Sequence, residues 1–272
     1  MRIAIFTDAH ISDKKNDEIR FYEKSSAKVQ TLFSYLKTMD VNKIFCLGDL
    51  FDSLDDSWLE QEMLRLSDSL AGLGLPFALT LGNHDALSGL YNRINAEFNP
   101  EGNQDGYFVL QDGGYNFIFL NTNYDSAGVH YDQGVVNDLD LNISEKQLQF
   151  LEKELKTRQI PTVILSHARI MSDPQADGEA YLINNAERVV NLLDAYSQVI
   201  LVIQGHAHKK EEYCYKGINY ISLPALIDGE TALPFIIGDF SSQSIKLFYY
   251  DTNDFAQIEW RETIEIPFVS NI

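Results

Sequence analysis

An apolar run near the N-terminus ends abruptly in polar residues: Ile3-Ala4-Ile5-Phe6-Thr7-Asp8-Ala9-His10. A short apolar run of this kind, bounded by polar residues, predicts a strand that is buried on both faces. The Asp-x-His that follows places a carboxylate and an imidazole just beyond the end of that strand. The same arrangement, a buried strand followed at once by His, Asp or Asn, recurs at four later points in the chain.

The chain alternates between predicted strands and predicted helices. Short apolar runs predict buried strands at residues 3–7, 43–47, 76–81, 116–120, 162–166 and 199–204. Apolar residues at helical spacing predict helices at residues 29–36, 59–70, 144–158 and 185–196. Ser144 and Gln147 resemble a capping box at the start of the third helix. This alternation favours an α/β fold in which helices cover the sheets.

The last part of the chain has a different pattern, with strands joined by turns. Strands are expected at residues 211–215, 218–223, 235–239, 246–250 and 258–263. Because the sequence has no Pro-, Gly- or Ser-rich linker and no internal repeat, we expect one domain over residues 1–272, with mainly antiparallel strands at about 211–272. The polar stretch 91–114 looks like an insertion with one strand at residues 107–110.

Composition narrows the classes of partner. The 272 residues include 40 acidic and 21 basic side chains, which gives a formal net charge of −19. This charge argues against binding to a nucleic acid polymer or to an anionic membrane. The two cysteines do not make a disulfide framework, and no apolar run approaches the roughly 18 residues needed to span a bilayer. We therefore expect a cytoplasmic protein. Its length is sufficient to bury a full hydrophobic core. The sequence does not determine its oligomeric state.

The positions of the histidines are the most informative feature. Five of the six directly follow predicted strands: His10, His84, His167, His206 and His208. The sixth, His130, lies in a polar loop and is expected to be solvated. Polar partners with oxygen donors accompany the five: Asp8, Asp49, Asp52, Asn83 and Asp85. Each motif alone could simply form a turn, because Gly, Asp and Asn are common turn residues. All five motifs, however, lie beyond the carboxyl ends of predicted strands, which is where ligands of α/β proteins bind.

Such a cluster of polar groups would be costly to bury without a cation. A donor set of Asp, His and Asn without Cys suits Mn, Fe or Zn better than Ca, with Mg as a further candidate. Seven of these ten side chains are candidate ligands, and seven are too many for one tetrahedral site. The sequence therefore predicts two divalent metal ions that share a carboxylate.

Taken in order, the motifs resemble those of a known superfamily. Asp8-x-His10, Gly48-Asp49-x-x-Asp52, Gly82-Asn83-His84-Asp85, a lone His167 and Gly205-His206-x-His208 are similar to the motif series of the calcineurin-like metallophosphoesterases. The resemblance implies two mixed β-sheets forming a sandwich flanked by helices. It also implies three groups of metal ligands: Asp8, His10 and His208 at a first metal, Asn83, His167 and His206 at a second, and Asp49 bridging the two. His84 would face the leaving group, and Asp52 would orient its ring.

The chemistry that follows is hydrolysis of a phosphoester. Two divalent metals outweigh the charges of Asp8, Asp49 and a bridging hydroxide, so the centre keeps a positive charge that attracts phosphate. A metal-bound hydroxide would attack phosphorus, and His84 would protonate the departing alkoxide.

The substrate class is narrowed by departures from related patterns. Protein phosphatases of the superfamily have Arg-Gly after the second motif and Glu at the end of the third, whereas this chain has Ser53-Leu54 and Asp85. The nearest resemblance is to bacterial class III cyclic-nucleotide phosphodiesterases, so we predict a phosphodiesterase acting on a small nucleotide or phosphorylated metabolite. A phosphomonoesterase or nucleotide diphosphatase is the alternative. A non-catalytic scaffold is least favoured, because no ligand is missing.

Several residues are open candidates for contact with the substrate. Arg169 is predicted to bind a substrate phosphate as a fork-shaped donor, and the alternative is that it pairs with an acidic residue. The polar segment 172–179 could be a lid or a surface connection. Tyr91 or Tyr124 could stack on a base or belong to the core.

Overall fold

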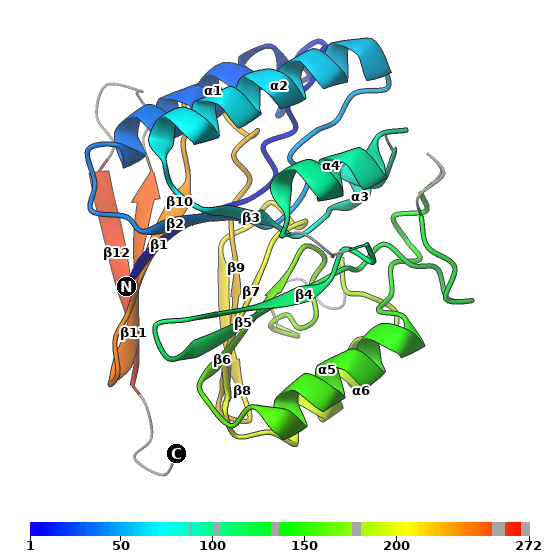
Figure 1. The fold of residues 1–272 in the computed structure, drawn as a ribbon, viewed down its shortest axis with the longest axis vertical. Coiled ribbons are helices and arrows are strands. Elements are labelled where there is room, and N and C mark those ends of the chain that lie inside the picture. The colour runs from blue at the N-terminus through cyan, green and yellow to red at the C-terminus, as the bar shows by residue number, and fades with distance from the viewer. Residues whose placement is uncertain (88, 101–103, 132–135, 176–180, 252–258, 268–272) are drawn as a thin grey trace.

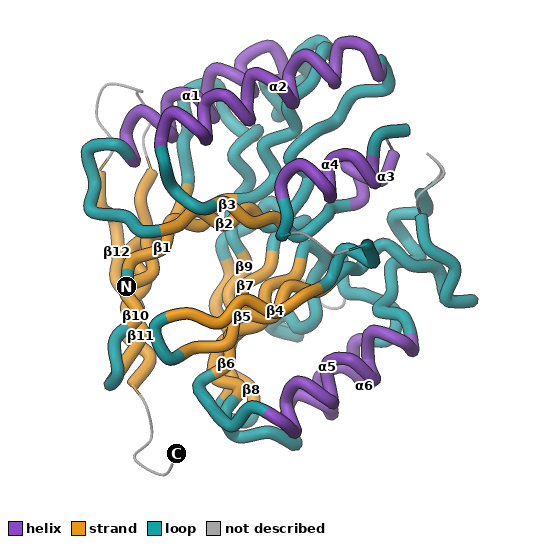
Figure 2. The backbone as a smooth tube through the Cα atoms, in the orientation of Figure 1, coloured by secondary structure: helices purple, strands orange, loops and turns teal. Residues whose placement is uncertain are grey.

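The computed structural model contains two six-stranded sheets that pack face to face (Figures 1 and 2). It describes all residues except 88, 101–103, 132–135, 176–180, 252–258 and 268–272. The first sheet has the order β12-β11-β10-β1-β2-β3 and the second the order β4-β5-β6-β7-β9-β8. In Figure 1, α1 and α2 lie on the outer side of the first sheet, and α5 and α6 lie on the outer side of the second.

The bounds of the elements are as follows. The first sheet contains β1 (Arg2–Phe6), β2 (Lys43–Cys46), β3 (Phe77–Leu79), β10 (Phe235–Phe240), β11 (Ser244–Asp251) and β12 (Glu259–Pro267). The second contains β4 (Phe108–Asp112), β5 (Tyr115–Leu120), β6 (Thr162–Ser166), β7 (Val199–Gln204), β8 (Glu211–Tyr215) and β9 (Ile218–Ser222). The helices are α1 (Tyr22–Leu36), α2 (Asp56–Leu73), α3 (Asn83–Leu87), α4 (Tyr91–Phe98), α5 (Glu145–Thr157) and α6 (Ala186–Asp194).

Both sheets are mixed, as the family resemblance implies. In the first, β1, β2 and β3 are parallel, and β10, β11 and β12 add antiparallel strands beside β1. In the second, β5, β6, β7 and β9 are parallel, and β4 and β8 are antiparallel edges. The strands after residue 211 are thus divided between the two sheets, and β10 pairs directly with the N-terminal strand.

The apolar run that begins the chain is buried on both faces. Ile3 and Ile5 point into the layer between the two sheets, whereas Ala4 and Phe6 belong to the core beneath α1 and α2. Because successive side chains of a strand alternate between its faces, every position in this strand must be apolar. Across the inter-sheet layer, the rings of Phe45 and Phe119 meet edge to face with their centroids 5.0 Å apart.

The structure corrects two local predictions. The stretch 91–114 contains the helix α4, which buries Tyr91, Ile94 and Phe98, before the expected strand. Ser144 caps α5 by accepting a hydrogen bond from the Gln147 backbone N–H, but the Gln147 side chain does not complete a capping box. It bonds instead to both backbone groups of Asn121. None of the helices in the described residues combines the length and apolar character that crossing a membrane requires.

A buried lysine ties α1 to the loop between β9 and β10. Lys28 is completely buried, and its Nζ lies 2.5–3.3 Å from the carbonyl oxygens of four consecutive residues, 226 to 229. Burial lowers the pKa of Lys28 to about 8, so the ammonium remains the main form at neutral pH. The contact matters for the site, because this loop carries Asp228.

We expect Lys28→Met to lower the free energy of unfolding by about 2–4 kcal/mol, because several buried carbonyl oxygens lose their donor. Urea denaturation followed by circular dichroism measures this change. Lys24→Met, one turn earlier on the same helix, is the control: its exposed ion pair with Glu230 contributes about 1 kcal/mol or less. Equal losses in the two variants would contradict the anchoring role of Lys28.

Candidate metal centre

The residues expected to bind metal come together from both sheets. They follow β1, β2 and β3 in the first sheet and β6 and β7 in the second. Their donor atoms form three overlapping groups, each within 4.8 Å: Asp8 with His10 and His208, His10 with Asp49 and His84, and Asp49 with His167 and His206.

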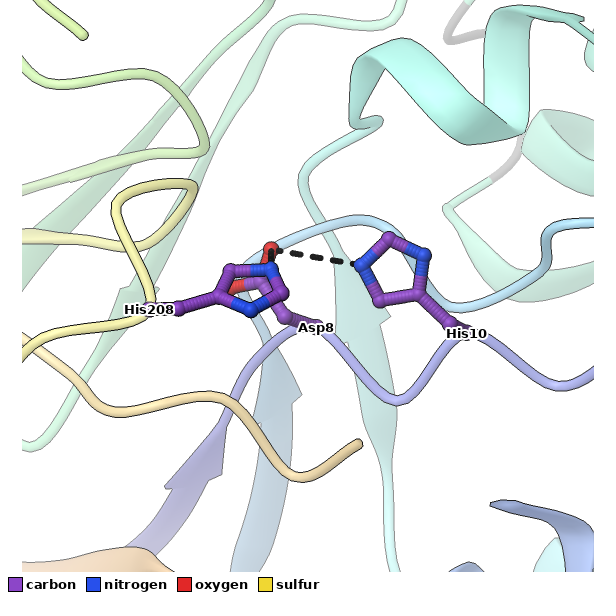
Figure 3. Close-up of side chains that lie close together, drawn as sticks. All are labelled: Asp8, His10 and His208. Atoms are coloured by element: carbon purple, nitrogen blue, oxygen red, sulfur yellow. Dashed lines mark ion pairs between the residues drawn. The ribbon is translucent and has the colours of Figure 1, made fainter. Parts of the chain in front are cut away.

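The first group is centred on one oxygen of Asp8 (Figure 3). Asp8 Oδ1 lies 3.4 Å from His208 Nε2 and 3.9 Å from His10 Nε2. The other oxygen, Oδ2, accepts hydrogen bonds from the Thr7 hydroxyl at 2.5 Å and from the His206 backbone N–H at 3.1 Å. These bonds hold the carboxylate so that Oδ1 faces the two imidazoles.

The group of Asp49, His167 and His206, called the second group from here on, is centred on His167. Its Nε2 lies 2.9 Å from Asn83 Oδ1 and 3.3 Å from Asp49 Oδ2, and its ring centroid is 5.0 Å from that of His206. The Asn83 amide nitrogen donates to Asp138 at 2.9 Å, which turns the amide oxygen toward His167. Asp138 has no motif around it, so sequence reasoning missed it.

A single oxygen of Asp49 faces both groups. Asp49 Oδ2 is 3.6 Å from His10 Nε2 and 3.3 Å from His167 Nε2. The second oxygen, Oδ1, accepts the backbone N–H of His84 at 2.8 Å. This is the placement that a carboxylate shared by two metals requires.

The donor set fits cations. Asp8 is 0% and Asp49 1% exposed, and in the described part of the chain neither Asp8 Oδ1 nor His10 Nε2 has a hydrogen-bond partner. Burial on its own lowers the pKa of a histidine, yet the nearby carboxylates raise the pKa of His167 to about 9 and that of His208 to about 10. The centre therefore has a negative potential that two divalent ions would neutralise.

Backbone strain is concentrated in the same residues. Positive φ angles occur at Asp8 (53°), His10 (45°), Asp49 (49°), His206 (67°) and His208 (56°). This left-handed conformation is unfavourable for residues other than glycine and is often found at functional sites. The strand ends therefore turn sharply here, which directs the side chains toward one another.

Glycines allow the strand ends to approach closely. A Cβ at Gly82 would collide with the backbone and carboxylate of Asp49, and one at Gly205 would collide with Thr7. The Gly-Asn-His and Gly-His-x-His motifs therefore need glycine because a larger residue has no space there.

Three rings of the centre, those of His10, His167 and His208, have a partner on the outer nitrogen. Asp52 approaches His10 Nδ1 at 3.3 Å, and the Leu47 carbonyl approaches His167 Nδ1 at 2.8 Å. Asp228 approaches His208 Nδ1 at 3.1 Å. Such partners fix the tautomer and leave Nε2 facing inward. Asp228 lies in a loop far from any motif, and no sequence signal marks it.

His84 is one of the partly exposed rings of the centre, as is His208, whose side chain is 16% exposed. His84 Nδ1 lies 2.8 Å from Asp52 Oδ1, as the resemblance implies. Its side chain is 17% exposed, whereas those of His10 and His167 are fully buried. The ring centroid is 4.6 Å from that of His10, so His84 stands at the solvent-facing edge of the centre on the side of the first group.

The structure does not present Arg169 to a substrate. The side chain is completely buried, and Nη2 lies 2.5 Å from Glu211 Oε2. The alternative role, pairing with an acidic residue, is the one observed. Glu211 is the first residue of β8, and its other oxygen accepts the backbone N–H of Asp173. Of the segment 172–179, which could be a lid or a surface connection, residues 176–179 lie outside the described residues, and both possibilities stay open.

The two tyrosines proposed to stack on a base are buried. Tyr91 is 1% and Tyr124 8% exposed. The ring of His130 lies between them, with centroid distances of 4.6 and 4.8 Å, and its Nε2 is 2.9 Å from the Tyr91 hydroxyl. The prediction that His130 is merely solvated is therefore wrong, because the residue belongs to an internal polar cluster.

We expect Asp49→Asn to reduce bound Mn²⁺ from about two ions per chain to fewer than one, because the oxygen that faces both groups loses its charge. Elemental analysis after dialysis against Mn²⁺ measures this, and circular dichroism checks the fold. Asp68→Asn, which changes an exposed aspartate on α2, should keep both ions. Two ions retained in Asp49→Asn would rule out the shared position.

Comparisons with known proteins agree with this geometry. The chain is 25% identical over 228 residues to a probable cyclic nucleotide phosphodiesterase of Coxiella burnetii, with 83% of each chain covered. It is 24% identical over 233 residues to a 3′,5′-cyclic-nucleotide phosphodiesterase of Nostoc sp., covering 82% of this chain and 77% of the relative. Its fold is similar to the crystal structure of a dimetal phosphatase from Danio rerio, with a TM-score of 0.76, 18% identity and 99% of both chains covered. A family model for calcineurin-like phosphoesterases matches residues 1–210, and the chain therefore belongs to that family.

Proposed function

We propose that this protein is a two-metal phosphodiesterase that acts on a small nucleotide or similar phosphorylated metabolite. The observation that carries the proposal is the position of Asp49 Oδ2 between His10 and His167. A complete set of donors surrounds it, and none of the expected positions has lost its side chain.

The proposed ligand assignment uses the first group and the second group of donor atoms and adds Asn83, whereas His84 stays off the metals. Asp8, His10 and His208 bind the first metal, Asn83, His167 and His206 bind the second, and Asp49 binds both. Imidazole, carboxylate and amide donors without a thiolate favour Mn, Fe or Zn, and Mg also accepts the oxygen donors. When bound, two such ions supply Lewis acidity and a water of lowered pKa.

His84 is proposed to act as the acid for the leaving group. Asp52 holds Nδ1 at 2.8 Å, so Nε2 is the nitrogen that is available to donate a proton. The partial exposure of the ring allows it to reach a substrate that lies over the metals. Asp52 thus orients two rings, because it also contacts His10.

Charge favours a diester of modest size. A phosphodiester carries one negative charge, whereas a monoester carries up to two and needs more positive charge around it. Arg169, the arginine expected to bind phosphate, is held by Glu211. The formal net charge of −19 also opposes binding of a polyanion. The names of the Coxiella burnetii and Nostoc relatives support the same substrate class.

With Mn²⁺ bound, we expect kcat/KM for bis(p-nitrophenyl) phosphate to exceed that for p-nitrophenyl phosphate by about tenfold or more. Initial rates of p-nitrophenolate release at equal enzyme concentration measure both, with Asp49→Asn as the control for contaminating activity. A faster monoester would favour the alternative, a phosphomonoesterase, and no turnover of either would refute a hydrolase of this type.

We expect His84→Asn to lower kcat for 3′,5′-cyclic AMP by roughly 10²- to 10⁴-fold while two metal ions stay bound. The loss should be much smaller for bis(p-nitrophenyl) phosphate, because p-nitrophenolate leaves without being protonated. Rates on both substrates, together with elemental analysis, separate the roles. Loss of metal, or an equal loss of rate on both substrates, would contradict the assignment of His84 as the acid.

A further inference from the structure

An exposed tyrosine stands at the edge of the second group of donors. Of the exposed large apolar side chains in the described part of the chain, Tyr181 is the aromatic one, with 56% of its surface accessible. Its ring meets that of His206 edge on, with centroids 5.6 Å apart and planes at 86°. The exposed tyrosine ring thus lies beside a residue proposed to bind metal.

The backbone of Tyr181 is held in an unfavourable conformation. Its φ of 63° is left-handed, which is rare for a bulky side chain. The Tyr181 carbonyl accepts the backbone N–H of Arg169 at 3.3 Å, and Arg169 in turn accepts the backbone N–H of Ile183 at 2.9 Å. The buried ion pair between Arg169 and Glu211 fixes this pairing. A strained backbone costs free energy and persists mainly at functional sites, so the left-handed conformation of a residue beside the metal centre points to a function.

The rings of the centre run in an order that gives the substrate a direction. His84 lies beside His10 on the side of the first group, and His206 lies between His167 and Tyr181 on the side of the second. When a phosphate lies over Asp49, Tyr181 is therefore on the side of the second group and His84 on the side of the first.

We propose that Tyr181 is a stacking platform for the nucleobase of the substrate, and that it makes the enzyme selective for nucleotides over base-free phosphate esters. This inference rests on the proposed function. An aromatic ring accepts any base, because each base has a π face, so the platform selects a class of substrate rather than one nucleotide. Arg169 acts as a positioning residue that holds the backbone of Tyr181.

The test measures binding, so it does not depend on turnover. The probes are 5′-AMP and ribose 5-phosphate, which share the phosphate and the sugar but differ in the base. Isothermal titration calorimetry with the Mn²⁺-loaded full chain gives both dissociation constants. We expect 5′-AMP to bind the unaltered protein more tightly, and Tyr181→Ala to weaken it by roughly 5- to 150-fold while ribose 5-phosphate changes by less than about twofold.

Two further variants separate stacking from other causes. Tyr181→Phe keeps the ring and should retain the preference for 5′-AMP, whereas loss of the preference in that variant would assign the effect to the hydroxyl. Leu64→Ala removes an exposed side chain from α2 and should change neither constant. If elemental analysis finds two bound metal ions in Tyr181→Ala, the substitution has not displaced His206 from the metal centre.

The inference is overturned if neither probe binds, if the unaltered protein binds the two equally, or if Tyr181→Ala weakens both to the same extent. Failure of the proposed function has a different signature, namely no hydrolysis of either p-nitrophenyl ester by the same Mn²⁺-loaded sample. A protein that hydrolyses the diester but binds the two probes equally would keep its proposed function and lose only the role of Tyr181.

Discussion

The burial of two carboxylates, Asp8 and Asp49, is the constraint on which the rest of the site depends. The strands β1 and β2 are parallel neighbours, with Phe6 opposite Cys46, so the residues that follow them emerge side by side. An ionised carboxylate without a counter-charge would cost more in a buried position than a typical domain can spare. Positive charge, such as that of metal ions, must therefore balance the two carboxylates. The histidines that would bind such ions come largely from the second sheet.

Other buried charges hold the loops around this centre. Lys28 on α1 binds the carbonyls of the loop that carries Asp228, and Asp228 in turn orients His208. Arg169 and Glu211 do the same on the other side, where they fix the segment that presents Tyr181. Strained backbone at the strand ends can persist only because its surroundings determine it this strongly. Stability and function are thus linked through pairs of groups that never touch the substrate.

Local patterns account for most of the fold. The predicted strands 162–166 and 199–204 match β6 and β7 residue for residue, because each contains an uninterrupted apolar stretch that ends at a polar residue. Helix α4 was not predicted, since its apolar positions span only two turns within a polar stretch. The predictions for Arg169 and His130 failed for another reason. Their partners, Glu211 and Tyr91, lie about forty residues away along the chain, and only folding brings them together.

The sequence by itself determined an α/β sandwich and the residues that meet at the strand ends, because strand periodicity and the polar residues after each strand are local properties. The resemblance of its motifs to a known family added that the two sheets are mixed. The tertiary structure decided how those residues are oriented. It placed one oxygen of Asp49 between His10 and His167, set Asp228 behind His208, and exposed Tyr181 while burying Tyr91. The direction of a side chain depends on contacts between segments that are remote in the chain, and a one-dimensional pattern does not contain those contacts.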